Sequence, residues 1–257
     1  MTNTYLILLL IAGCVVAAAL LFLKIVRRNS WHDVTEPHND AIGFVYSSIA
    51  VLYAVVLAFT LIAVWERFDA AEAIVNDEAN ALTDLYIMSA TLPEDERIEF
   101  HGLLDAYVVR VIDVEWDAMM SPEIFDNCAC DEAQAIWSWF LTSDPSLFPN
   151  ETVYAESLTR LSEFYNFRRT RLNMASGGLA DFILVLLTFT AFPTILGPAI
   201  LGVKSGKVHV LIVTGAAVSI SIMVVSVFLI NQPFDSQVSV GAEPFHHVLE
   251  IAERFRN

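Results

Sequence analysis

Apolar residues lie in four long uncharged blocks, at residues 5–23, 41–65, 182–203 and 210–230. A helix crosses the ~30 Å hydrocarbon core of a bilayer with about 20 residues, so each block has the length of a membrane span. The first block follows the sequence MTNT, which has no Lys or Arg, and it exceeds the core of a signal peptide, about 7–15 residues. We therefore expect it to be a retained helix.

The second block continues beyond the expected membrane surface. After Trp65 there is no Gly or Pro until Pro93, and apolar residues recur every seven positions at Phe68, Val75 and Leu82. This spacing is typical of one helix face. We expect a single helix over about residues 41–90, roughly 75 Å long at 1.5 Å per residue. Its outer half must pack against other helices.

The residues after this helix predict more helices and no strands. An amphipathic helix is expected over 94–120, a short one over 131–141, and another over about 151–175. Pro193 and the pair Gly197-Pro198 predict a kink or break in the third span, because proline removes a backbone donor. A short amphipathic helix is expected over about 244–254.

Together these elements predict an all-α membrane protein with four transmembrane helices and a helical extramembrane domain inserted between the second and third. The expected parts are a first transmembrane hairpin over 1–65 (spans about 5–26 and 41–65), the domain over 66–179, continuous with spans two and three, a second hairpin over 180–232 (spans about 181–203 and 208–230), and a tail over 233–257. The composition agrees, because 56% of the 257 residues are hydrophobic and only 17% are charged.

Negative charge is concentrated in the predicted domain. Residues 66–179 contain 22 acidic side chains and 7 arginines, a net of −15 out of −16 for the whole chain. Such a domain attracts cations and repels anions at low salt.

Several kinds of chemistry are absent from the sequence. There is no phosphate-binding loop, nucleophile elbow or CxxC pair, and the uncharged blocks contain no Asp, Glu, Lys, Arg or His. The pattern disfavours a proton-coupled carrier and an enzyme, and it predicts no cofactor. A membrane enzyme acting through the domain carboxylates, including Asp84, stays an alternative. The three cysteines, Cys14, Cys128 and Cys130, predict no disulfide framework.

Two polar groups near the membrane ends have alternative interpretations. Arg168, Arg169 and Arg171 precede the third span; they fit lipid-headgroup contact, and also pairing with acidic residues of the long helix or with an anion. The connector between the first two spans fits a solvated turn ending in an N-cap at Asn39 or Asp40. It also holds weak candidates for a divalent-cation site: His32, Asp33, His38 and Asp40.

Several stretches resemble the bestrophin-like family of bacterial multi-pass membrane proteins over about residues 39–250. They are GFVYSSIAVLYAVVLAF, VWERFDAAEAIVNDEANALTDLY, LPEDER, AYVVRVIDVEW, RRTRLNMASGG and NQPFDSQVSV. The resemblance implies a protein of the bacterial inner membrane. From bestrophins proper it implies a homopentameric ion channel whose second span lines the pore, with lipid, identical subunits and inorganic ions as partners and no nucleic acid. No acidic calcium clasp can be matched residue by residue.

The second span supplies the candidate pore residues. Small and hydroxyl side chains near its start and bulky apolar ones later would make a ring with an apolar constriction; packing against helices or lipid is the alternative. The candidates are Ser47, Ser48, Tyr53, Val55, Val56, Phe59 and Ile62, with Glu66, Asp69 and Glu78 as an acidic vestibule. We expect a cation-preferring channel. An anion channel of the same architecture, and a non-conducting scaffold or sensor that binds a partner or divalent ion through the domain, are the alternatives.

The side of the membrane that the domain faces is left open. The short connectors carry Lys24, Arg27, Arg28, Lys204 and Lys207, which places the domain outside the cytoplasm by the positive-inside rule. Resemblance to bestrophins implies a cytosolic domain, and four arginines at the domain-side membrane ends make the two counts nearly equal.

Overall fold

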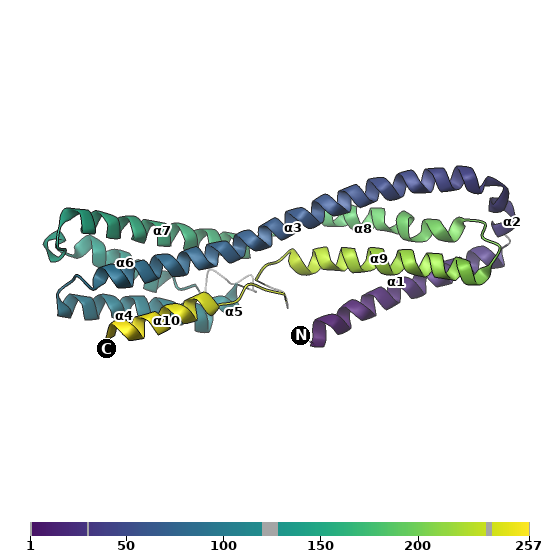
Figure 1. Ribbon diagram of the computed structural model, residues 1–257. Coiled ribbons are helices and arrows are strands. Elements are labelled where there is room, and N and C mark those ends of the chain that lie inside the picture. Colours follow the sequence, from purple (N-terminus) through teal and green to yellow (C-terminus); the bar gives the residue numbers. More distant parts are fainter. Residues whose placement is uncertain (1, 30, 120–127, 235–237, 257) are drawn as a thin grey trace. The chain divides into compact units, whose positions relative to one another are not determined.

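The computed structural model describes residues 2–29, 31–119, 128–234 and 238–256, and every regular element among them is a helix (Figure 1). The chain divides into two compact units, each described by itself. The first unit contains residues 1–66 and 179–231, and the second contains residues 67–178 and 232–257.

The first unit contains the candidate membrane spans. They are α1 (Thr2–Arg28), the first half of α3 (Asn39–Ser89), α8 (Asp181–Leu196) and α9 (Gly206–Ile230). These four helices are long and apolar enough to cross a membrane, as the four blocks predict. Helix α1 packs along α9, and α8 packs against α9 and also contacts α1. Small residues such as Ala19, Ala191 and Ala217 are buried where the helices meet, and they allow close approach of the backbones.

The predicted break in the third span is confirmed. Helix α8 ends at Leu196 and a 3₁₀ turn, η4 (Gly197–Ile200), follows. Because Pro198 has no N–H, the Thr194 carbonyl lacks its usual helical donor, and the Tyr46 hydroxyl of α3 donates to it instead at 3.1 Å. A Cβ atom at Gly197 would overlap the Tyr46 ring. Glycine at that position therefore lets α3 approach the end of α8.

The connector between the first two spans is more ordered than a turn. It forms α2 (Trp31–Thr35) and a 3₁₀ turn, η1 (Glu36–His38), directly before α3. The Asn39 side chain pairs with both backbone groups of Gly202, donating from Nδ2 at 3.0 Å and accepting on Oδ1 at 2.8 Å. The predicted N-cap at Asn39 is wrong, because its amide fastens the two connectors of the first unit together.

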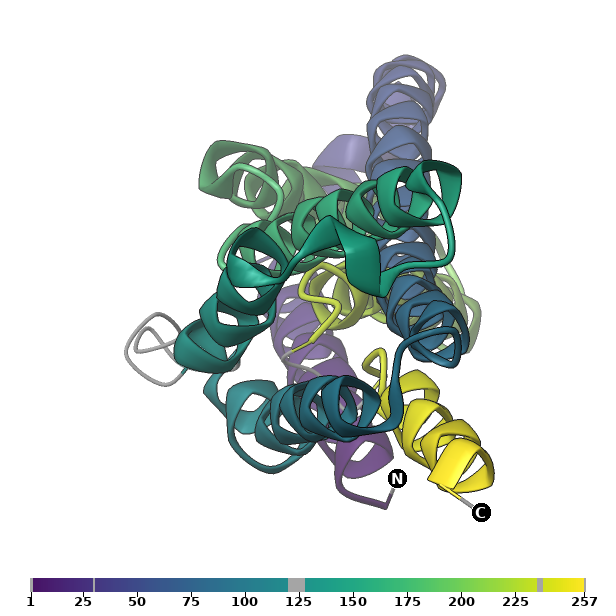
Figure 2. The same cartoon turned by 90° about the vertical axis from the view of Figure 1, so that its left-hand side faces the viewer.

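The second unit is a helical bundle (Figure 2). Besides the second half of α3 it contains α4 (Glu94–Arg110), a π-helical turn η2 (Val111–Glu115), α5 (Trp116–Ala118), α6 (Cys130–Thr142), η3 (Pro145–Leu147), α7 (Glu151–Ala175) and α10 (Glu243–Arg256). Helix α4 packs against α6 and α10, and α6 packs against α7. The three predicted helices between residues 94 and 175 and the tail helix are confirmed, the first with the π-helical turn near its end.

Aromatic and aliphatic side chains fill the core of the second unit. The predicted stripe of α3 is buried at Val75 and Leu82, and Phe68 packs at its edge. Phe100 of α4 meets the rings of Trp139 and Phe140 of α6, with centroids 4.6 and 5.3 Å apart. Aromatic pairs at such separations add to the energy gained by burying their area. This packing holds the long helices at fixed rotations, and it thereby positions the charged groups described below.

Candidate functional site

Helix α3 has a buried side and an exposed side within the first unit. Tyr53, Thr60 and Val64 are buried and, at about 100° per residue, fall on one face of the helix. The opposite side carries Val55, Phe59 and Ile62, which are 48%, 70% and 52% exposed. Tyr53, which was also predicted to line a pore, is 5% exposed and packs in the core of the first unit.

The exposed side begins and ends with polar residues. Helical spacing places Ser48 and Glu66 on the same side as Val55, Phe59 and Ile62, and both are exposed. We call these five residues the outer face of α3. The other candidates, Ser47 and Val56, are exposed on either flank of it. The hydroxyls of Ser47 and Ser48 donate to the carbonyls of Gly43 and Phe44 at 2.7 and 3.0 Å, so each hydroxyl oxygen can still act as an acceptor.

The three predicted vestibule acids differ in their surroundings. Glu66 and Asp69 are exposed. Glu78 is completely buried in the second unit and forms an ion pair with Arg171 at 2.7 Å. It is a structural carboxylate and does not face solvent, because it falls on the buried stripe of α3 between Val75 and Leu82.

Glu78 belongs to a buried charge cluster, which comprises Glu78, Tyr107, Glu115, Arg168 and Arg171. Arg171 donates two hydrogen bonds to the Glu78 carboxylate, from Nε at 2.7 Å and from Nη2 at 3.0 Å. Its Nη2 also donates to the Glu115 carboxylate at 2.6 Å. The Tyr107 hydroxyl donates to the same Glu78 carboxylate. The two glutamates and two arginines balance in charge, which buried ions require.

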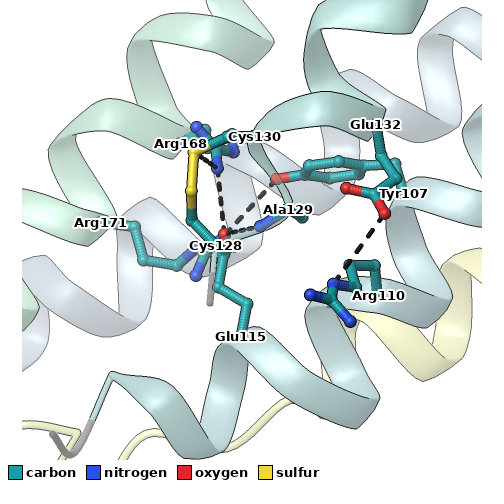
Figure 3. The surroundings of a disulfide bond; sticks show 9 residues. All are labelled: Tyr107, Arg110, Glu115, Cys128, Ala129, Cys130, Glu132, Arg168 and Arg171. Atoms are coloured by element: carbon teal, nitrogen blue, oxygen red, sulfur yellow. Dashed lines mark hydrogen bonds and ion pairs between the residues drawn. A yellow bond between two sulfur atoms is a disulfide. The ribbon is translucent and has the colours of Figure 1, made fainter. Parts of the chain in front are cut away.

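The second half of the cluster lies beside a disulfide bond (Figure 3). Arg168 donates from Nη2 to Glu115 at 3.0 Å and to the Cys130 sulfur at 3.4 Å. Glu115 also accepts the backbone N–H of Ala129 at 2.6 Å. A disulfide joins Cys128 to Cys130, whose oxidation state the sequence left open, while Cys14 on α1 is free. Glu115 therefore ties the Cys128-Ala129-Cys130 segment to α7 through Arg168.

The cluster shifts the protonation equilibria of its members. Burial favours a higher pKa for Glu115, but the charges of Arg171 and Arg168 and hydrogen bonds from Arg171 and Ala129 outweigh it and lower the pKa below its ordinary value. Burial, together with the nearby Glu78 charge, raises the pKa of Tyr107 well above its ordinary value. Glu115 thus stays charged and Tyr107 stays a proton donor over the physiological pH range.

Aromatic rings complete the enclosure of Arg171. Its guanidinium carbon lies 5.5 Å from the ring centroid of Trp116 and 5.5 Å from that of Phe245 on α10. Contacts of this kind stabilise a buried cation by an amount of order 2 kcal/mol. The tail helix is therefore part of the enclosure of the cluster.

Of the two interpretations of the three arginines, pairing with acidic residues of the long helix is confirmed for Arg171. Arg168 is also buried but pairs with Glu115, and Arg169 is exposed. Glu115 was not among the site residues predicted from the sequence. A signal was present, because Glu115 follows Leu104, Val108 and Val111 at helical spacing on the buried face.

The connector candidates for a cation site lie apart from this cluster along the chain. Asp33, His38 and Asp40 are exposed, and the side chain of His32 lies outside the described part of the structure. Among the residues that the structure describes, no three His, Cys, Asp or Glu side chains gather in a group that could hold a metal ion.

Comparisons with known proteins agree with the fold. The family model for the Bestrophin-like domain matches residues 10–245. The chain is similar to the crystal structure of a bacterial Bestrophin homolog from Klebsiella pneumoniae, with a TM-score of 0.73 at 12% identity over 98% of each chain. A point-mutant structure of that homolog gives a TM-score of 0.76 at 12% identity, covering 96% of this chain and 99% of that one. No curated protein matches the chain.

Proposed function

This chain belongs to the Bestrophin-like family, and we propose from that premise that identical subunits assemble into an ion channel of the bacterial inner membrane whose pore is lined by α3. The resemblance to bestrophins implies five subunits. The observation that carries the proposal is the outer face of α3. It exposes Val55, Phe59 and Ile62 on the side opposite the subunit core, between the polar residues Ser48 and Glu66.

A ring of these faces has the profile of a gated pore. Phe59 and Ile62 from each subunit would form an apolar constriction, where water is unstable when the opening is narrow. Ser48 on one side of the constriction and Glu66 on the other would keep the wider ends hydrated. The same face turned toward lipid would leave Phe59 without any effect on conduction, so the two arrangements can be distinguished by experiment.

Cation preference follows from the charge that remains at the proposed mouth. Glu66 and Asp69 are exposed, while the positive charges of Arg168 and Arg171 are buried and neutralised by Glu78 and Glu115. Residues 66–179 as a whole keep a net charge of −15, so acids dominate the charge of this part of the chain. Such a field raises the local cation concentration, and it weakens as salt rises.

Ion flux from purified protein in liposomes tests this proposal. We expect K⁺ or Na⁺ gradients to drive flux from a particle of several subunits, with smaller Cl⁻ flux and a cation preference that falls at high salt. Flux of Cl⁻ in excess of cations would support the anion channel of the same architecture. A well-behaved oligomer that conducts no ion would contradict the proposal and favour the scaffold or sensor.

A further inference from the structure

The Cys128–Cys130 disulfide has no role in the proposed pore, but the exposure of Cys130 and the positive groups beside it bear on its reactivity. The two cysteines are separated by one residue, Ala129, and Cys130 is the first residue of α6. The residue Cys130 is exposed, whereas Cys128 is partly buried. An exposed disulfide is more easily reduced than a buried structural one.

Two positive features meet at Cys130. Arg168 donates to its sulfur at 3.4 Å, and α6 is a 13-residue helix whose N-terminal end carries a partial positive charge. Cationic groups and helix N-termini stabilise a thiolate, which is the reactive form of cysteine. Either feature alone would be unremarkable on a protein surface; here both act on one sulfur.

Arg168 has hydrogen-bonding capacity left for a thiolate. Its side chain is 9% exposed, and its Nε atom is buried with no hydrogen-bond partner among the residues that the structure describes. A disulfide sulfur is a weak acceptor, whereas a thiolate carries a full charge. Reduction of the disulfide would therefore turn a weak acceptor of this guanidinium into a charged one, in addition to the Glu115 carboxylate that it already binds.

We propose that Cys128 and Cys130 form a redox-active thiol–disulfide site, in which Cys130 exchanges with external thiols and disulfides and Cys128 is the resolving cysteine. The assignment follows from exposure and charge, because Cys130 is exposed and lies beside Arg168 while Cys128 is partly buried. This inference does not rest on ion conduction.

The exchange is balanced in two steps. The Cys130 thiolate attacks an external disulfide RSSR, forming a mixed disulfide and releasing RS⁻. Cys128, after losing its proton, attacks the Cys130 sulfur, forming the intramolecular bond and releasing the second RS⁻. Two electrons pass to the external disulfide, and the two cysteine protons end on the two RSH molecules. Reduction by two external thiols is the reverse.

The redox state would also alter the buried charge cluster. In the reduced form the Cys130 thiolate competes with Glu115 for Arg168, which the disulfide sulfur does only weakly. The Ala129 N–H bond to Glu115 keeps the segment beside the cluster. The site therefore has a route to influence the packing of the second unit.

A glutathione titration of the full chain tests whether the disulfide is redox-active. The Cys14→Ser variant removes the remaining thiol, and maleimide–polyethylene glycol labelling reports free cysteines by a gel shift. We expect reversible, two-electron conversion as the ratio of reduced to oxidised glutathione rises, with unchanged helical circular dichroism. A disulfide that persists in excess reduced glutathione until the protein unfolds, or thiols that never reoxidise, would overturn the proposal.

A second experiment separates the roles of the two cysteines. In the Cys14→Ser background, Cys128→Ser retains Cys130 alone and Cys130→Ser retains Cys128 alone. At pH 7 we expect the Cys128→Ser variant to form a mixed disulfide with oxidised glutathione about tenfold faster than the Cys130→Ser variant. Adding Arg168→Met to the Cys128→Ser variant should remove most of this difference in rate. Adding Arg168→Lys instead should preserve more of it, because lysine keeps the positive charge. Equal rates for the two single-cysteine variants, with both proteins folded, would overturn the assignment of Cys130.

Discussion

Arg171 shows how a charged side chain can be accommodated inside a helical bundle. It is completely buried. Its guanidinium donates hydrogen bonds to four acceptors: the carboxylates of Glu78 and Glu115, the Tyr107 hydroxyl and the Met119 sulfur. Removing one partner of such a cluster leaves an uncompensated buried charge. In the sequence, the glutamates were only part of an acidic domain and the arginines only part of a basic group. The glutamates lie on α3 and η2 and the arginines on α7, so no local sequence pattern could predict which of them form ion pairs.

We predict that Arg171→Met destabilises the second unit by about 3–5 kcal/mol, because Glu78 and part of Glu115 lose their cation. The double variant Glu78→Gln, Arg171→Met should recover part of the loss. The measurement is thermal or denaturant unfolding in detergent, followed by tryptophan fluorescence. Arg160→Met on the same helix is the matched control. Arg160 pairs with Glu156, Glu163 and Asp84 at the surface, so its removal should cost much less stability than the removal of Arg171. Equal losses for the two arginines would contradict this account of the cluster.

The lowered pKa of Glu115 predicts how stability depends on pH. A carboxylate whose pKa is lower in the folded than in the unfolded state contributes stability that is present above the unfolded pKa and is lost as pH falls through the folded pKa. Unfolding temperatures should therefore fall below about pH 4.3, the ordinary value for glutamate. Glu115→Gln should be less stable at pH 7 yet lose less stability on acidification. Glu99→Gln, at an exposed position on α4, should keep the slope of the unmodified chain. An unchanged slope in Glu115→Gln would contradict the prediction.

At the scale of elements, hydrophobic periodicity predicted the helices well. The long helix was predicted from a seven-residue apolar repeat, and the break in the third span from Pro193 and Pro198. Each of these patterns lies within the element that it predicts, so both features could be derived from the sequence. The sequence could not predict which face of α3 turns toward the core of the first unit, because the spanning part of this helix carries uncharged residues on every face. Tyr53 was assigned to the pore for that reason, and only tertiary packing shows that it faces the core. The Asn39–Gly202 pair joins residues 163 positions apart, beyond the reach of any capping rule.

At the scale of the whole molecule, the proposed channel depends on surfaces that one chain leaves uncovered. The outer face of α3 carries large apolar side chains, and among them Phe59 is 70% exposed. Exposure alone does not separate a pore from a lipid contact, since both put apolar side chains outside the subunit core. The polar residues at both ends of the face favour the pore, and a pair of matched substitutions can decide the matter.

The most direct measurement compares cation flux through liposomes containing the Phe59→Ala and Phe189→Ala variants. Both phenylalanines lie in candidate spans and both are 70% exposed, but Phe189 is on α8. If α3 lines the pore, Phe59→Ala removes the bulk of the constriction, and we expect flux to rise by about tenfold or more, with Phe189→Ala unchanged. Equal flux through both variants and the unmodified protein, at equal reconstitution, would contradict the claim that this face of α3 surrounds a conducting pore.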